Sequence, residues 1–186
     1  PREHRRLIVS FRNRFVFVAV PRTGTHTVRA ALAPHLAPGD WRQQALHGRA
    51  TLPVPELAAV GHGHLSMAQV EPHLPPGFRA RALAFAFVRE PLDRFVSAVS
   101  FLFRKDPAFA RDPVGLVRKA LRVPRFRRRV LLRPQWTFLC DPQGRPIVDF
   151  VGRHERFAQD LAEVCARIGL PAPAPERRNE SPRPDA

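Results

Sequence analysis

The stretch FVFVAVPRTGTHTVRAAL, residues 15–32, decides the fold of this chain. Its first six residues are apolar and rich in β-branched and aromatic side chains, which predicts a buried strand. The strand ends at Pro21, because proline cannot donate to a sheet hydrogen bond. From Val28 to Leu32 the apolar residues recur with helical spacing. The stretch therefore predicts a strand, a short loop and the N-terminus of a helix.

The loop between this strand and this helix has a composition that suits a bound anion. A helix N-terminus presents unpaired N–H groups and the positive end of the helix dipole. Gly24 lets the backbone approach an anion closely, the threonine hydroxyls can donate hydrogen bonds, and Arg22 adds a full positive charge. We expect a phosphate or a sulfate to bind to the loop residues Arg22, Thr23, Gly24, Thr25, His26 and Thr27.

An ordinary strand-to-helix turn with a capping threonine is the alternative interpretation of this loop. The loop is not a Walker A loop, because the pattern GxxxxGK[ST] is absent from the sequence. The hydrolysis of ATP or GTP therefore loses its main support as a function.

Length and composition predict one folded domain over residues 1–186. With 44% hydrophobic residues the chain can build a core over about residues 7–170, and we expect the proline-rich tail, 171–186, to be partly disordered. No run of about 18 apolar residues is present, so we expect no transmembrane segment. Cys140 and Cys165 are expected to be reduced thiols.

Positive charge dominates the chain and is dense between residues 118 and 133. The formal net charge of +15 implies affinity for a polyanion such as a nucleotide, an acidic glycan or a nucleic acid. The dense segment carries Arg118, Lys119, Arg122, Arg125, Arg127, Arg128, Arg129 and Arg133. It is either a solvated surface or a strip that binds an acidic polysaccharide. Nucleic acid is the weaker candidate partner, because Phe126 is the only aromatic residue among these cations.

The segment GHGHLS, residues 61–66, brings two histidines close together. His62 and His64 are two positions apart, which points both side chains to one side of an extended segment. They can be ordinary loop histidines, a metal pair that lacks further ligands at motif spacing, or a site of acid–base catalysis near neutral pH. Ser66 and Gln69 form a capping-box pattern, which predicts a helix that starts here.

A second strand-to-helix junction follows an apolar run at residues 82–88, which predicts a central parallel strand buried on both faces. Arg89 lies at the carboxyl end of this strand, where ligands bind in open α/β sheets. Ser97, about two helical turns further on, can face the same crevice. The alternatives are an ion pair of Arg89 with Glu90 or Asp93, and a plain surface position for Ser97.

Weaker patterns predict the remaining elements. We expect loops over residues 34–55 and 104–113, a helix over 114–121 and a hairpin-like unit over 133–152, which has a turn at 141–144 and a strand at 146–152. The last helix carries an apolar stripe that includes Phe157, Leu161 and Cys165, which places Cys165 in the core.

The two junctions resemble the donor-binding motifs of sulfotransferases that use 3′-phosphoadenosine-5′-phosphosulfate (PAPS). PRTGTHT resembles the loop that binds the 5′-phosphosulfate, with Arg22 where the family usually has lysine. Arginine keeps the charge but cannot lose its proton, so turnover can differ. FVREPLDRFVSAVSFLF resembles the motif that binds the 3′-phosphate, which implies that role for Arg89 and Ser97, and an ion pair that tethers the helix for Arg94.

Two further segments resemble carbohydrate sulfotransferases. GHGHLS is similar to the segment of glycosaminoglycan uronyl 2-O-sulfotransferases that holds the catalytic histidine, which implies that His64 is the base and that His62 lies beside the acceptor. The PQ…LC and DFVGxxE patterns are similar to Golgi-type enzymes and their bacterial relatives, which implies that Gln135, with Arg133, lies near the acceptor and that Glu155 is structural. Residues 179–181 match a turn near the donor.

The resemblance implies a P-loop-like, three-layer α/β fold with a central parallel sheet flanked by helices. It implies transfer of a sulfuryl group from PAPS to a hydroxyl of a carbohydrate acceptor, with an acidic polysaccharide among the candidates, by in-line displacement and without a metal ion. We expect a soluble, cytoplasmic protein of a bacterium. A nucleotide-binding module without turnover, and a basic domain that binds polyanions or nucleic acid, are the alternatives.

Overall fold

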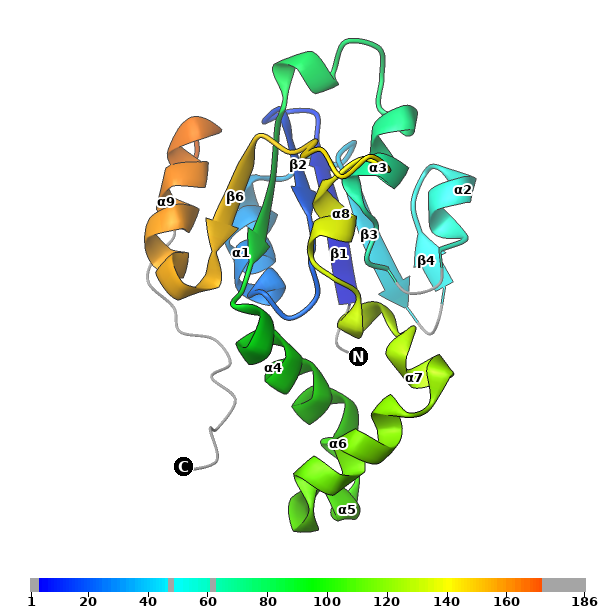
Figure 1. Cartoon of the computed structure of the whole chain (residues 1–186). Helices are drawn as coiled ribbons and strands as arrows, with labels where there is room; N and C mark the ends of the chain where they lie inside the picture. Colours follow the sequence, from blue (N-terminus) through cyan, green and yellow to red (C-terminus); the bar gives the residue numbers. More distant parts are fainter. Residues whose placement is uncertain (1–3, 47–48, 61–62, 172–186) are drawn as a thin grey trace.

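One mixed sheet forms the middle of the molecule (Figure 1). The computed structural model describes residues 4–46, 49–60 and 63–171, and within them the strand order is β4-β3-β1-β2-β5-β6. The strands are β1 (His4–Ser10), β2 (Phe15–Val18), β3 (Trp41–Leu46), β4 (Arg49–Thr51), β5 (Leu83–Val88) and β6 (Phe150–Arg153). The two apolar runs predicted as strands are β2 and β5, which lie side by side.

The sheet is partly antiparallel, which corrects the prediction of a central parallel sheet. β2 pairs in parallel with β5, and β5 in parallel with β6. β1, β3 and β4 run antiparallel to their neighbours. The turn at residues 11–14 joins β1 directly to β2, and so short a connection allows only antiparallel pairing.

Helices cover both faces of the sheet, so the fold is α/β with three layers. Successive side chains of a strand point to opposite faces. One face packs Phe15, Phe17, Phe85 and Phe87 against residues of α1 (Thr25–Leu32) and α9 (Phe157–Arg167). The other face packs Val16, Val18, Ala84 and Ala86 against residues of α2 (Pro55–Ala58), α3 (Met67–Val70) and α8 (Trp136–Leu139). The apolar runs of β2 and β5 are thus buried from both sides.

Four helices extend beyond the sheet edge at which β5 ends (Figure 1). They are α4 (Pro91–Phe103), α5 (Pro107–Arg111), α6 (Pro113–Leu121) and α7 (Pro124–Arg127). Each starts with a proline, whose missing N–H costs nothing in the first turn. The carboxylates of Glu90, Asp106 and Asp112 accept hydrogen bonds from backbone N–H groups in the first turns of α4, α5 and α6. The prediction of a loop over 104–113 is wrong because it overlooked this cap-and-proline signal at α5.

Two other segments also differ from the predictions. β3 and β4 lie within residues 34–55, where a loop is predicted, because pairing with β1 and with each other makes this segment extended. The hairpin-like unit over 133–152 is confirmed only in part: an isolated antiparallel bridge between Cys140 and Pro146 spans the turn at 141–144, and β6 overlaps the expected strand. The residues before the turn form α8, and β6 pairs in parallel with β5. The helix over 114–121, the capping box of Ser66 and Gln69, and the buried position of Cys165 are confirmed.

Both cysteines are free thiols. Within the part of the chain that the structure describes, no helix combines the length and the apolar character that crossing a bilayer requires. His62 and the predicted turn at 179–181 lie outside the described residues.

Candidate anion-binding site at the carboxyl edge of the sheet

The parallel strands β2, β5 and β6 end at the same edge of the sheet, and each leads into residues with charged or hydroxyl side chains. Residues 21–24 follow β2, Arg89 follows β5, and His154 follows β6. In open α/β sheets, ligands bind outside the carboxyl ends of parallel strands. Sheet topology therefore brings together two segments that are predicted to bind an anion and a third, at His154 and Glu155, for which only a structural role of Glu155 is predicted.

The loop after β2 is held in shape by its own hydroxyl groups. Thr23 Oγ1 donates to the carbonyl oxygen of Val20 at 3.0 Å, and Thr25 Oγ1 donates to the same oxygen at 2.9 Å. Arg22 and Gly24 have left-handed backbone angles, with φ of 66° and 88°. Left-handed angles suit glycine, and a Cβ atom at Gly24 would lie 2.5 Å from Cε2 of Phe157. Glycine is therefore required here by the turn and by the neighbouring ring.

Backbone N–H groups remain available at this turn. Among the described residues, the N–H groups of Thr23, Gly24 and Thr25 donate to no protein acceptor, whereas the N–H of Thr27 donates to the carbonyl oxygen of Gly24. Gly24 is the N-cap of α1, and no side chain caps this helix. An anion that binds here would meet N–H donors and the positive end of the helix dipole. The predicted contribution of Thr23 and Thr25 thus falls on their backbone, because their hydroxyls are used within the loop.

Arg22 links the two motifs directly. Its Nε and Nη2 atoms donate to Oγ of Ser97 on α4, at 3.1 and 2.9 Å. Its Cζ atom lies 4.8 Å from the centre of the Phe101 ring, and Cζ of Arg104 lies 4.1 Å from the same ring. Burial, followed by the charges of Arg89 and Arg104, lowers the pKa of Arg22 from its ordinary value. Several positive charges therefore converge on a partly buried place, which a bound anion would stabilise.

Arg89 is positioned by Gln135. The backbone N–H of Arg89 donates to Oε1 of Gln135 at 2.9 Å, and Nε2 of Gln135 donates to the carbonyl oxygen of Arg89 at 2.7 Å. Nη2 of Arg89 lies 3.8 Å from Oδ2 of Asp93, a distance at which the ion pair is weak and water-exposed on the Asp93 side. The buried Nε of Arg89 has no hydrogen-bond partner among the described residues. The Gln135 amide thus holds the Arg89 backbone, and its predicted contact with an acceptor stays a prediction.

His154 and Glu155 complete this edge. Burial, and then the charge of Arg89, lower the pKa of His154, although Glu155 and Asp93 act in the opposite direction. Burial raises the pKa of Glu155, but hydrogen bonds from the backbone N–H groups of Glu90 and Glu155 outweigh it, so the net shift is downward. Oε1 of Glu155 accepts from the N–H of Glu90 at 2.7 Å, a structural contact between the start of α4 and the end of β6. The sequence analysis missed His154, because only the pairing of β6 with β5 places it beside Arg89.

His64 is buried beside the end of β2. Its side chain is 6% exposed, and Nδ1 lies 2.7 Å from the carbonyl oxygen of Ala19. Because a carbonyl oxygen only accepts, Nδ1 carries the proton, and the lone pair of the neutral imidazole lies on Nε2. This tautomer is the one that a general base using Nε2 requires.

Two other predicted site residues, His26 and Arg133, take no part in the hydrogen bonds between Arg22 and Ser97, and Arg94 is bonded differently than expected. His26 lines a small cavity together with Arg29 and Arg42, between α1 and the strands β1 and β3. Arg133 is exposed, and its carbonyl oxygen accepts from Nη2 of Arg94 at 2.7 Å. Nη1 of Arg94 donates to the carbonyl oxygen of Leu131, so the expected ion pair of Arg94 is replaced by two backbone carbonyls.

Within the described residues, no group of three or more His, Cys, Asp or Glu side chains could hold a metal ion. The N–H groups at the first turn of α1 and the converging charges of Arg22, Arg89 and Arg104 suit a bound anion, and a histidine of fixed tautomer lies next to β2. Comparison with protein-family models, with curated proteins and with solved structures finds no match to this chain.

Proposed function

We propose that this protein is a PAPS-dependent sulfotransferase that transfers a sulfuryl group to a hydroxyl of a carbohydrate acceptor. The observation that carries the proposal is the pair of hydrogen bonds from Arg22 to Ser97. These residues belong to two motifs 75 positions apart, and each follows a strand of the same parallel pair. PAPS carries phosphate groups on both sides of one ribose, so its two binding motifs must lie this close together. A P-loop-like arrangement of the sheet and α1 is part of the proposal.

The donor would be held through its two anionic ends. The 5′-phosphosulfate would receive hydrogen bonds from the N–H groups of Thr23, Gly24 and Thr25 and charge from Arg22. The 3′-phosphate would lie at Arg89 and Ser97. A hydroxyl group has one donor and two acceptor positions, so Ser97 can accept from Arg22 and still donate its proton to a phosphate oxygen.

His64 would act as the general base. The acceptor hydroxyl oxygen forms a bond to sulfur while the bond from sulfur to the bridging phosphate oxygen breaks, and the hydroxyl proton passes to Nε2 of His64. Adenosine 3′,5′-bisphosphate leaves, and Arg22 stabilises the negative charge that grows on its 5′-phosphate. The hydrogen bond from Nδ1 to Ala19 fixes the imidazole in the tautomer that this step needs.

Isothermal titration calorimetry tests the donor site. We expect adenosine 3′,5′-bisphosphate to bind with a micromolar dissociation constant. Adenosine 5′-monophosphate should bind at least tenfold more weakly, because it lacks the 3′-phosphate and so loses about one charge-assisted contact. Arg89→Ala should abolish the preference for the bisphosphate. The control Arg12→Ala changes an exposed residue in the turn between β1 and β2, at the other end of the sheet, and should keep that preference. Equal binding of both nucleotides would reject a PAPS site.

Transfer of labelled sulfate from PAPS to a panel of carbohydrate acceptors tests the reaction itself. His64→Gln should lower the rate by about a hundredfold or more while adenosine 3′,5′-bisphosphate still binds, which also shows that the variant is folded. Binding of the nucleotide without transfer to any acceptor would favour a nucleotide-binding module. Full activity of His64→Gln would remove His64 as the base.

A further inference from the structure

The segment from residue 104 to residue 133, which we call the basic lobe, carries more than half of the net positive charge of the chain. It contains eleven Lys and Arg residues and two Asp residues, against a net charge of +15 for the whole sequence. Both aspartates cap helices, Asp106 at α5 and Asp112 at α6. Within the described residues, none of the lobe's cations forms an ion pair. Ion pairs among the described residues therefore do not neutralise the charge of the lobe.

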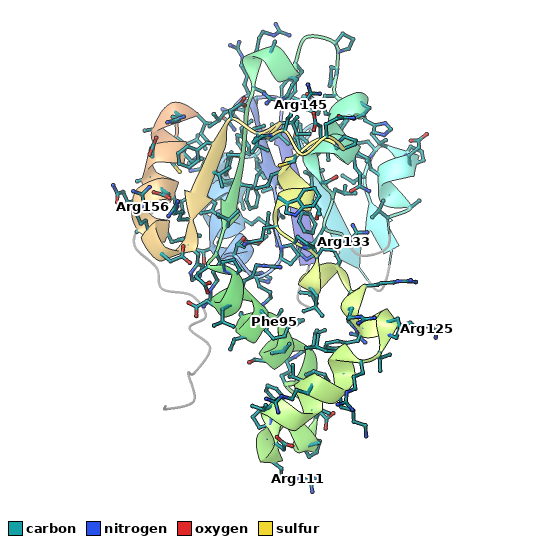
Figure 2. All side chains as sticks on the ribbon, viewed as in Figure 1. Phe95, Arg111, Arg125, Arg133, Arg145 and Arg156 are labelled. Carbon is teal, nitrogen blue, oxygen red and sulfur yellow. The ribbon has the colours of Figure 1, made fainter. Side chains whose placement is uncertain are left out.

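The cations of the lobe reach outward. Arg111 extends from the tip of the lobe and Arg125 from its side, away from the sheet (Figure 2). Nine of the lobe's cations between residues 111 and 133 are exposed: Arg111, Arg118, Lys119, Arg122, Arg125, Arg127, Arg128, Arg129 and Arg133. This arrangement leaves the lobe open to an extended negative surface.

Apolar side chains lie exposed among these cations. Val114 is 58% exposed and Val123 is 49% exposed. Val114, Arg118 and Arg122 follow one another at intervals of four residues, so they form one stripe along α6. α6 has five apolar residues out of nine, yet it buries none of its residues fully. Of these five, Val114 is exposed and the other four are half-buried. Val114 and Val123 therefore place exposed aliphatic surface next to the cations, which is suited to contact with an apolar phase.

The aromatic residues of the lobe point the other way. Phe103 stacks with Phe109 and with Phe126, at ring-centre distances of 5.7 and 5.4 Å, and Phe126 is buried. These rings pack against one another, so stacking on nucleic-acid bases or sugar rings would require them to separate. The like charge of two lobes opposes the docking of a second copy. Cations interleaved with exposed aliphatic side chains instead match a bilayer surface, with its anionic headgroups above acyl chains.

We propose that the basic lobe docks on the surface of a membrane that contains anionic lipid. The lobe extends from the sheet edge at which the candidate anion site lies (Figure 1), so docking would hold that site close to the bilayer. The inference concerns the lobe and is independent of the proposed sulfuryl transfer, because vesicle binding is measured without nucleotide.

Co-sedimentation with lipid vesicles tests the proposal. We expect the full chain to bind vesicles of phosphatidylcholine with about one third phosphatidylglycerol, and to bind vesicles of phosphatidylcholine alone at least tenfold more weakly. Arg125→Gln with Arg128→Gln should reduce binding to the anionic vesicles by about tenfold or more. The matched control is Arg12→Gln with Arg81→Gln, which removes the same charge at the opposite sheet edge and should change binding by less than about twofold.

A second pair separates a membrane from a dissolved polyanion. Val114→Ser with Val123→Ser keeps the charge, so it should weaken vesicle binding by about tenfold while binding to dextran sulfate stays unchanged. The proposal is overturned if Arg12→Gln with Arg81→Gln loses as much vesicle binding as the lobe variant, or if Val114→Ser with Val123→Ser binds vesicles fully. Either result would favour an acidic polysaccharide as the partner. If Arg125→Gln with Arg128→Gln unfolds, as circular dichroism would reveal, Arg118→Gln with Lys119→Gln on α6 takes its place, with the same expected loss.

Discussion

At the scale of single residues, Arg22 and Ser97 define the candidate site. Arg22 stands in a left-handed backbone conformation, which is uncommon for a residue other than glycine. The conformation directs its guanidinium to Ser97 and to the ring of Phe101. Strain of this kind persists where the surrounding structure enforces it, and it gathers at functional sites. The local geometry thus supports a binding function for the loop, in addition to a structural one.

Ser97→Ala tests this contact. The substitution removes the acceptor of two Arg22 hydrogen bonds, so we expect the free energy of unfolding to fall by about 1–2 kcal/mol. The affinity for adenosine 3′,5′-bisphosphate should fall about tenfold, because the hydroxyl that would donate to the phosphate is also lost. Urea unfolding and calorimetry measure the two effects. Ser100→Ala on the same helix is the control, and an equal loss of affinity there would show that the Ser97 hydroxyl has no special contact.

The pKa of His154 reports on the charge at the candidate site. Burial and the charge of Arg89 place its folded pKa below the ordinary value of 6.5. Between pH 6.5 and the lower folded pKa, the unfolded chain binds more protons than the folded chain. The contribution of His154 to the free energy of unfolding is therefore fully present above pH 6.5 and is lost as the pH falls toward the folded pKa. NMR titration of the His154 Cε1–H signal should show the lowered pKa, and adenosine 3′,5′-bisphosphate should raise it, because phosphate charge favours the imidazolium. A pKa indifferent to the nucleotide would place the phosphate away from Arg89.

At the scale of elements, the sequence predicts the helices and strands whose residue pattern is contained within the element itself. β2 and β5 are continuous apolar runs, and α4 starts with a proline and continues with an apolar stripe, so all three could be predicted. β3 could not, because it is a strand only through its pairing with β1. For β6 the sequence predicts a strand at 146–152, which overlaps Phe150–Arg153, but not its parallel pairing with β5. The candidate site follows the same division. Arg22, Arg89 and Ser97 sit in local motifs, whereas His154 enters only through the strand order.

Gly24→Ala tests the junction between β2 and α1. Alanine at this position would have to adopt a left-handed backbone conformation. Its Cβ atom would also lie 2.5 Å from the Phe157 ring, so α9 would have to shift. We expect a loss of about 2–3 kcal/mol in the free energy of unfolding, together with weaker nucleotide binding, since the same turn presents the N–H donors. Gly39→Ala is the matched control, because a Cβ there has no neighbour within 4 Å. Unfolding curves that coincide for the two variants would contradict the packing of α9 against the loop.

At the scale of the whole molecule, the net charge of +15 is the dominant electrostatic feature. Within residues 4–46, 49–60 and 63–171, ion pairs form at Arg79, Arg89, Arg145, Arg156 and Arg167, and most lie at the surface. Surface pairs contribute about 0–1 kcal/mol each, so they do not offset the repulsion among the remaining cations. Self-repulsion of a highly charged chain destabilises its compact state.

Added salt should therefore stabilise this protein. Between low ionic strength and about 0.5 M sodium chloride, the screening length falls to a few ångströms, so repulsion weakens and the unfolding temperature should rise by several degrees. Differential scanning calorimetry over a series of salt concentrations measures this slope. Arg125→Gln with Arg128→Gln, which relieves repulsion within the basic lobe, should raise the unfolding temperature at low salt and flatten the slope. An unfolding temperature that falls as salt is added would mean that attractive ion pairs outweigh repulsion, and that the positive charge of the lobe is compensated within the fold.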